Sequence, residues 1–113
     1  MTPETPTAID NADAIAAVPG VDVLLIGTND LCAEMGIHGD FANERVADAY
    51  RTMIAASKKH GKFPGMAGIY NEPLMQRYIE MGARFILSGN DATFLMASAT
   101  QRARFLGKTH TPM

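Results

Sequence analysis

One short segment constrains the fold of this chain more than any other. Residues 21–26 (VDVLLI) are almost wholly apolar and rich in branched side chains, and Gly27 follows them directly. An apolar run of this length is typical of a β-strand that is covered on both faces, as strands in parallel sheets are. We therefore expect a buried strand that ends at Gly27.

Helical and strand patterns alternate along the rest of the chain. Apolar residues recur at helical spacing, with capping residues and terminal glycines at the boundaries, in segments 6–18, 43–60, 71–81 and 91–106. Two further strands are predicted at 62–70 and 84–87, the first of them weaker because it contains Pro64, Gly65 and Gly68. Helices between successive strands imply parallel pairing through right-handed crossovers. The sequence thus predicts an α/β fold of about three parallel strands alternating with four helices.

These elements do not enclose their own sheet. Three strands that are apolar on both faces cannot be covered fully by four helices. We expect the strands to join a larger sheet or another copy of the same chain. A homo-oligomer is one consequence, because unpaired sheet edges favour self-association.

The composition narrows the classes of partner. A chain of 113 residues that is 47% hydrophobic and 19% charged is typical of one globular domain. Its formal net charge of -2 provides no cationic face for nucleic acid or an anionic membrane, so a small soluble ligand is favoured. No apolar run reaches membrane-spanning length, and the N-terminus lacks the pattern of a signal peptide. With Cys32 as the single cysteine, these features predict a cytoplasmic protein in which Cys32 is a buried apolar residue.

Two strand ends share a local design. Residues 24–31 (LLIGTNDL) are echoed by residues 85–92 (FILSGNDA), each an apolar strand followed by Gly and then Asn-Asp. In such a turn, an aspartate can accept hydrogen bonds from the first N–H groups of the next helix. We interpret Asp91 as a residue of this capping kind. Asp30 is a candidate ligand, because ligands bind at the carboxyl ends of parallel strands.

Several motifs occur in an order that resembles one known family. They are residues 4–8 (ETPTA), 16–22 (AAVPGVD), 26–31 (IGTNDL), 60–62 (HGK) and 78–85 (YIEMGARF). The family usually reads I-E-T, then A-A-V-x-G-V-D, then I-G-P-x-D-L-S. From Glu4 to about Leu106, the chain resembles the C-terminal portion of the HpcH/HpaI aldolase/citrate lyase family.

The resemblance implies a fold and an activity. Residues 1–107 would be the C-terminal half of a β/α (TIM-type) barrel aldolase domain, and residues 108–113 a polar tail. Family members cleave or form a carbon–carbon bond next to a 2-oxo acid, typically releasing pyruvate, and use Mg²⁺ or Mn²⁺. By resemblance, Glu4 and Asp30 are the metal ligands, and Gly27, Asn29 and Asp30 contact the substrate, with the Asn29 backbone N–H holding the pyruvate carboxylate. Carboxylate oxygens suit a hard cation that polarises the oxo group.

The chain also departs from the family pattern. Thr28 replaces the usual Pro, Cys32 replaces the usual Ser, and the three residues before Glu4 are too few and too polar to form the strand that normally carries it. Without the resemblance, the favoured interpretation of Glu4 is a solvated acid near a helix start; with it, the metal-ligand interpretation is equally favoured. The family's catalytic His and Arg belong to the N-terminal half, and none of His38, His60 and His110 matches them, so we assign no catalytic residue and expect these histidines at the surface.

Two functional hypotheses remain open. The first is a metal-dependent lyase of the aldolase class, acting on a 4-hydroxy-2-oxo acid with groups that this chain does not supply. The second is a non-catalytic half-barrel that self-associates and retains at most a remnant metal or oxo-acid site. A flavodoxin-like binding module ranks below both, because no G-x-G-x-x-G phosphate loop is present.

Overall fold

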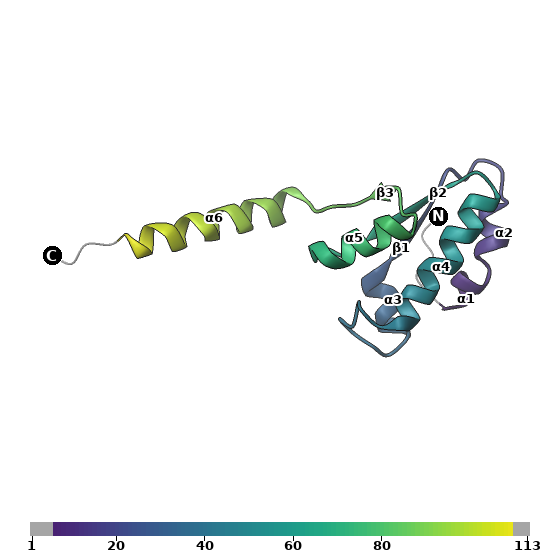
Figure 1. Cartoon of the computed structure of the whole chain (residues 1–113), viewed down its shortest axis with the longest axis horizontal. Helices are drawn as coiled ribbons and strands as arrows, with labels where there is room; N and C mark the ends of the chain where they lie inside the picture. Colours follow the sequence, from purple (N-terminus) through teal and green to yellow (C-terminus); the bar gives the residue numbers. More distant parts are fainter. Residues whose placement is uncertain (1–5, 110–113) are drawn as a thin grey trace.

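Three parallel strands form the sheet at the centre of the molecule. The computed structural model describes residues 6–109, and its strands β1 (Val23–Gly27), β2 (Phe63–Ala67) and β3 (Phe85–Ile86) pair in sequence order. The helices are α1 (Pro6–Asp10), α2 (Ala12–Ala16), α3 (Thr28–Glu34), α4 (Glu44–Lys59), α5 (Glu72–Met81) and α6 (Asp91–Lys108) (Figure 1). The predicted alternation of helices and parallel strands is confirmed.

The helices α4 and α5 begin and end where the sequence predicts. The Asn43 side chain accepts a hydrogen bond from the Arg45 backbone N–H at the start of α4, and Asn71 does the same for the Leu74 N–H at the start of α5. Pro73 is tolerated in the first turn of α5, and Gly82 ends that helix with a φ of 133°. The α4 helix packs against β1, β2, α1, α2 and α5, so it is the main structural support of the sheet.

The strands differ from the predicted bounds by a few residues, and β2 is the most shortened, at Phe63–Ala67 instead of 62–70. The helices differ in three further details. The single helix expected at 6–18 is divided into α1 and α2 at Asn11, whose backbone (φ −94°, ψ 10°) departs from the helical conformation. An additional helix, α3, begins directly after β1 and buries Leu31 and Cys32 in the core. The last helix, which was expected to end before Gly107, continues through it to Lys108.

The two faces of the sheet have different environments. Leu24 and Ile26 of β1 are fully buried, whereas Val23 and Leu25, which alternate with them, are only partly buried. Leu25, Gly65 and Phe85 stand side by side in the strand register, and Phe85 remains 45% exposed. One face is therefore covered by helices, and the other carries an apolar row that the described residues leave partly open.

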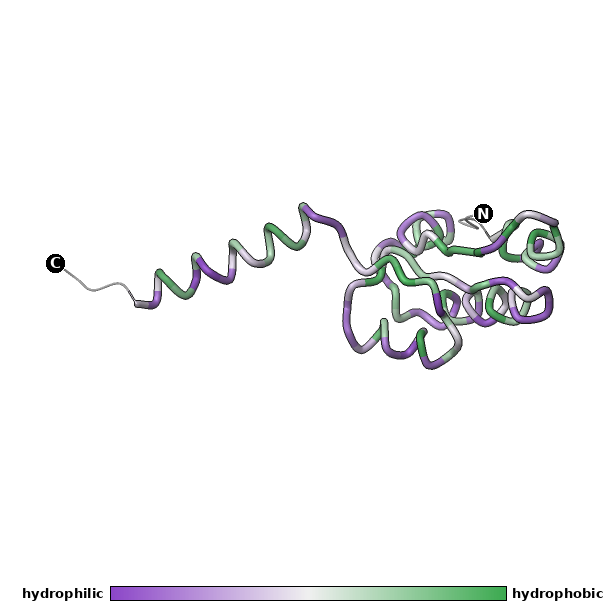
Figure 2. Tube along the Cα trace, turned by 90° about the horizontal axis from the view of Figure 1, so that it is seen from above, coloured by the Kyte–Doolittle hydropathy of each residue, from purple (hydrophilic) through white to green (hydrophobic). Residues whose placement is uncertain are grey.

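The α6 helix stands apart from the rest of the molecule (Figures 1 and 2). None of its residues is buried, and the molecule measures 67 × 29 × 22 Å. The radius of gyration is 17.8 Å, whereas a compact chain of this length has about 13 Å. Within residues 6–109, no helix combines the length and the apolar character needed to cross a membrane.

Candidate functional site

The turns that follow the three strands meet at one edge of the sheet. Because the strands are parallel, the turn at 28–30, the loop at 68–71 and the loop at 87–90 all leave from the carboxyl edge. Gly27 pairs with Ala67 in the register, so the first two turns are direct neighbours. A Cβ atom added to Gly68 would lie 3.3 Å from Nδ2 of Asn29 and 3.5 Å from its backbone N. Gly68, with a φ of 85°, thus allows the two turns to approach closely.

Asp30 is an exposed carboxylate in the first turn of α3. The α3 helix has no side-chain cap, and within residues 6–109 the Asp30 carboxylate has neither a hydrogen bond nor an ion pair. Its position after β1 agrees with the prediction, and so do those of Gly27, at the end of the strand, and Asn29, in the turn. A capping role does not account for Asp30.

The echoed turn near β3 is different. The side chain of Asn90 accepts a hydrogen bond from the Thr93 N–H at 2.8 Å and is the N-cap of α6. Asp91 is the first residue of that helix, and its Oδ1 accepts from the Ala92 N–H at 2.8 Å. Capping is therefore the role of this turn, but Asn90 rather than Asp91 is the cap. The two similar sequences serve different local purposes.

A buried hydroxyl group joins the site turn to the core. Oγ1 of Thr28 lies 2.6 Å from the carbonyl oxygen of Ala67 and 2.8 Å from the hydroxyl oxygen of Tyr50, and both side chains are fully buried. The Tyr50 ring stacks on Tyr78 with centroids 4.2 Å apart, and the Tyr78 hydroxyl donates to the Phe41 carbonyl. Burial raises the pKa of the Tyr50 hydroxyl well above its ordinary value. The sequence analysis noted Thr28 only as a departure from the family's usual Pro and did not predict this network.

The metal-binding prediction rests on two carboxylates, of which one is described. Glu4 lies outside the described residues, and residues 6–109 contain no cluster of three His, Cys, Asp or Glu side chains that could hold an ion. A magnesium ion is usually held by one or two carboxylates together with waters and substrate oxygens, so it does not require such a cluster. An exposed, unpartnered carboxylate at Asp30 fits a donor set of this kind.

The described histidines and the cysteine agree with the structural roles predicted for them. His38 is exposed, and Nε2 of His60 lies 3.1 Å from Oδ1 of Asp13. Lys59 and His60 hold the pKa of the Asp13 carboxyl below its ordinary value, by hydrogen bonds and by charge. This contact lies at the end of α4 that leads into β2, opposite the edge that carries Asp30. Cys32 is fully buried, and burial raises the pKa of its thiol; His110 lies outside the described residues.

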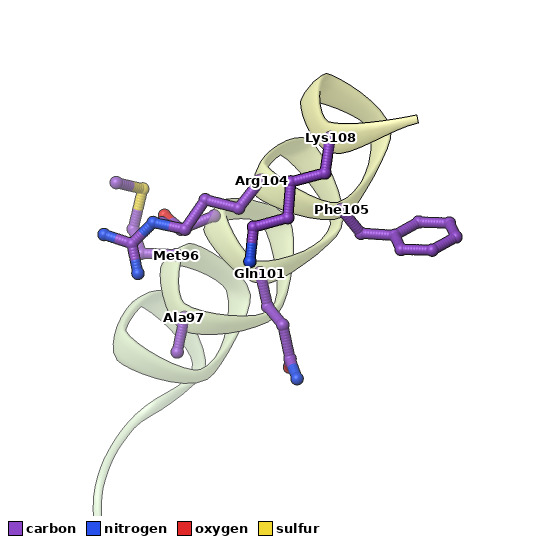
Figure 3. A pocket seen from close by; sticks show the side chains of 7 residues that line it. Met96, Ala97, Gln101, Arg104, Phe105 and Lys108 are labelled. Atoms are coloured by element: carbon purple, nitrogen blue, oxygen red, sulfur yellow. The ribbon is translucent and has the colours of Figure 1, made fainter. Parts of the chain in front are cut away.

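A hollow on α6 is not a second site. Its lining residues all belong to that one helix, between Met96 and Lys108. Met96 and Arg104 extend to one side of the helix and Phe105 to the other, so no wall encloses the space between them (Figure 3). The carboxyl edge of the sheet therefore remains the candidate site.

The fold and this edge define the class of protein. Parallel strands alternating with helices, with candidate ligands at the strands' carboxyl ends, are the arrangement of α/β proteins that bind ligands at this edge, β/α barrels among them. The model of the HpcH/HpaI aldolase/citrate lyase family matches residues 2–98, and the chain belongs to this family.

Individual relatives agree with this assignment. The chain is 44% identical over 102 residues to a 4-hydroxy-4-methyl-2-oxoglutarate aldolase of Hapsidospora irregularis, covering 88% of this chain and 38% of that protein. It is 39% identical over 108 residues to a 4-hydroxy-2-oxo-heptane-1,7-dioate aldolase of Escherichia coli, covering 96% and 41%. The crystal structure of an HpcH/HpaI aldolase/citrate lyase family protein from Burkholderia cenocepacia superimposes with a TM-score of 0.84 at 30% identity, over 93% of this chain and 40% of that one. The chain thus spans about two fifths of the length of these relatives.

Proposed function

We propose that this chain supplies the metal-binding carboxylate of a carbon–carbon lyase that acts on 4-hydroxy-2-oxo acids and releases pyruvate. The observation that carries the proposal is Asp30: an exposed carboxylate without a partner in the described chain, at the carboxyl edge of a parallel sheet, in a member of an aldolase family. The resemblance pairs it with Glu4 as the second carboxylate. The ion would be Mg²⁺ or Mn²⁺, and when bound it would polarise the oxo group of the substrate.

The neighbouring backbone would orient the 2-oxo acid. Gly27 and Asn29 precede Asp30 in the same turn, and Gly68 keeps a side chain out of the space beside Asn29. A carboxylate held at the Asn29 backbone N–H would place the oxo group of the same molecule next to Asp30. We assign no general base or catalytic cation to this chain. In the full barrel these groups would come from the part that residues 1–107 do not supply, with residues 108–113 as a tail.

A second candidate function is a self-associating scaffold without catalysis. The observation that favours it is the exposed apolar surface, which includes Phe63 and Phe85 on the sheet and Phe94, Leu95, Phe105 and Leu106 on α6. Surfaces of this kind are normally covered by another chain or by more of the same sheet. Under either function, we propose that the chain forms a homo-oligomer. We also propose a cytoplasmic location, because a single cysteine suits a reducing compartment.

A titration with Mn²⁺ tests the metal site. Free Mn²⁺ is followed by electron paramagnetic resonance in the presence of pyruvate, with the intact chain, with Asp30→Ala and with Asp91→Ala as the matched control. We expect Asp30→Ala to raise the dissociation constant by at least about tenfold, which corresponds to about 1.4 kcal/mol. Asp91→Ala should leave it unchanged, because that side chain only accepts from the Ala92 N–H. Equal losses of Mn²⁺ affinity in the two variants would show that Asp30 is not a metal ligand.

A second assay separates the lyase from the scaffold. Pyruvate release from a 4-hydroxy-2-oxo acid is measured by coupled reduction, with the chain alone and with a longer protein that includes an N-terminal barrel half. The lyase hypothesis predicts turnover by the longer protein and its loss in Asp30→Ala. If the longer protein releases no pyruvate, only the scaffold hypothesis survives.

A further inference from the structure

We infer that Thr28 and Tyr50 act as a positioning pair, which fixes the turn holding Asn29 and Asp30 against the end of β2. The inference deepens the proposed function and rests on it, because its purpose would be to hold the metal and oxo-acid contacts in place. Neither residue would touch the metal or the substrate. The argument starts from the direction of the hydrogen bonds.

Only one assignment of donors and acceptors satisfies the hydrogen bonds around Thr28. A carbonyl oxygen can only accept, so the single hydroxyl proton of Thr28 is donated to the Ala67 carbonyl at 2.6 Å. The Tyr50 hydroxyl, 2.8 Å from Oγ1 of Thr28, must then donate to that oxygen. The result is a directed chain from Tyr50 through Thr28 to Ala67, in which each bond polarises the next.

This chain of bonds connects three parts of the fold. Tyr50 belongs to α4, Thr28 is the first residue of α3, and Ala67 is the last residue of β2. Ala67 pairs with Gly27 in the sheet, so the bond from Thr28 crosses between strands at the level where both end. It therefore joins the start of the turn that carries Asn29 and Asp30 directly to the neighbouring strand.

Tyr50, at the start of this series of hydrogen bonds, is held in place by its surroundings. The Tyr50 ring is fully buried and stacked on the Tyr78 ring of α5 at 4.2 Å, with an angle of 24° between the planes. The turn beyond Thr28 packs against Gly68, close to Asn29. Asn29 and Asp30 are themselves exposed, so the buried pair behind them is what restrains their position.

Three variants and one control test the inference on the full chain. Thr28→Val removes the hydroxyl and keeps the shape, Thr28→Ser restores the hydroxyl, and Tyr50→Phe removes the donor alone. Ser57→Ala is the control, since Ser57 is also a fully buried hydroxyl, but it contacts Sδ of Met53 at 3.6 Å, away from the turn. Two quantities are measured: the Mn²⁺ dissociation constant and the amide hydrogen exchange of the buried α3 residues Leu31 and Cys32, directly after the turn, relative to Leu24 in β1.

The expected pattern separates positioning from general stability. Thr28→Val should weaken Mn²⁺ binding about tenfold, as the loss of an outer-shell partner does, and speed exchange at Leu31 and Cys32 but not at Leu24. Thr28→Ser should restore both quantities, and Tyr50→Phe should show a smaller change in the same direction. If Thr28→Val does not fold, the same two quantities are compared between Thr28→Ser, which should match the parent chain, and Tyr50→Phe, which should not.

The inference is overturned if exchange at the two residues rises no more in Thr28→Val, or in Tyr50→Phe, than in Ser57→Ala. It is also overturned if Thr28→Ser fails to restore slow exchange. If the unaltered chain binds no Mn²⁺, the proposed function fails in this chain, and the exchange measurement alone decides whether the pair positions the turn. The two failures are therefore distinguishable.

Discussion

The hydroxyl group of Tyr50 lies fully buried where α4 meets the end of the sheet, and its burial raises its pKa. In the unfolded chain a tyrosine ionises near pH 10, whereas the buried hydroxyl in the folded chain stays neutral to higher pH. Above about pH 10 the unfolded chain therefore binds fewer protons than the folded one. The stability that this difference represents is present below the unfolded pKa and is lost as the pH rises towards the folded pKa.

This shift predicts an alkaline loss of stability that depends on one residue. Between pH 10 and 11, Tyr50 contributes up to about 1.4 kcal/mol per pH unit to the fall in the free energy of unfolding. Urea unfolding at several pH values should show a shallower fall in Tyr50→Phe, with a remainder from Tyr78, whose pKa burial also raises. Tyr70→Phe, at an exposed tyrosine, is the control. Identical slopes in the parent chain and in Tyr50→Phe would contradict the burial argument.

Single residues also mark the limit of what the sequence could predict. The position of Asp30 after a buried strand followed from the apolar run before it, and the structure agrees. The sequence analysis assigned capping to Asp91 and a ligand role to Asp30, but the nearly identical motif letters could not show that Asn90, not Asp91, is the cap. Only the hydrogen bond from the Thr93 N–H to Asn90 separates a capped helix from an uncapped one. Glu4 lies outside the described residues, so its role stays a prediction.

At the scale of elements, helices with clear sequence patterns were predicted correctly, whereas elements with weak patterns depend on tertiary packing. The α4 and α5 helices carry clear caps, and both were predicted to within a few residues. The α3 helix was missed because its seven residues show less than two full helical turns of periodicity; it forms because Leu31 and Cys32 are buried. In β2, Pro64 and Gly65 weaken the strand pattern, yet the strand pairs with both neighbours, and Leu25 of β1 occupies the space that a side chain at Gly65 would need.

The exposed apolar face of α6 leads to a prediction about assembly. Phe94, Leu95, Phe105 and Leu106 share one side of the helix at 3.6 residues per turn, and Leu95 and Leu106 are 70% and 58% exposed. Introducing charge there should disrupt self-association without unfolding the rest of the chain, since no residue of α6 is buried. The test is the Leu95→Glu and Leu106→Glu double variant, measured by light scattering during size exclusion.

The matched control is Thr93→Glu with Ala97→Glu, which adds the same charge to the opposite side of α6. We expect the parent chain and the control to have the same multiple of 12.2 kDa, and the double variant to have 12.2 kDa. A parent chain that already has the mass of one copy would remove the argument for an oligomer built through α6.

At the scale of the whole molecule, the chain has the fold of part of an HpcH/HpaI aldolase and exposes apolar side chains on its sheet and on α6. The sequence predicted this from strands that are apolar on both faces, and the exposed Phe63 and Phe85 agree. What it could not predict is the direction of α6, because the path of a helix without tertiary contacts is not encoded in its own periodicity. The candidate site lies at the edge of the sheet where the three parallel strands end.

The central claim is that a divalent metal binds at this carboxyl edge through Asp30. The most direct test is the loss of backbone amide signals in nuclear magnetic resonance spectra as Mn²⁺ is added with pyruvate, because the ion broadens the signals nearest to it. We predict that Asn29, Asp30 and Gly68 lose their signals first, and that Asp30→Asn abolishes this order. Broadening that begins instead at the acidic residues of the opposite edge, such as Asp13, or that is unchanged in Asp30→Asn, would contradict the account.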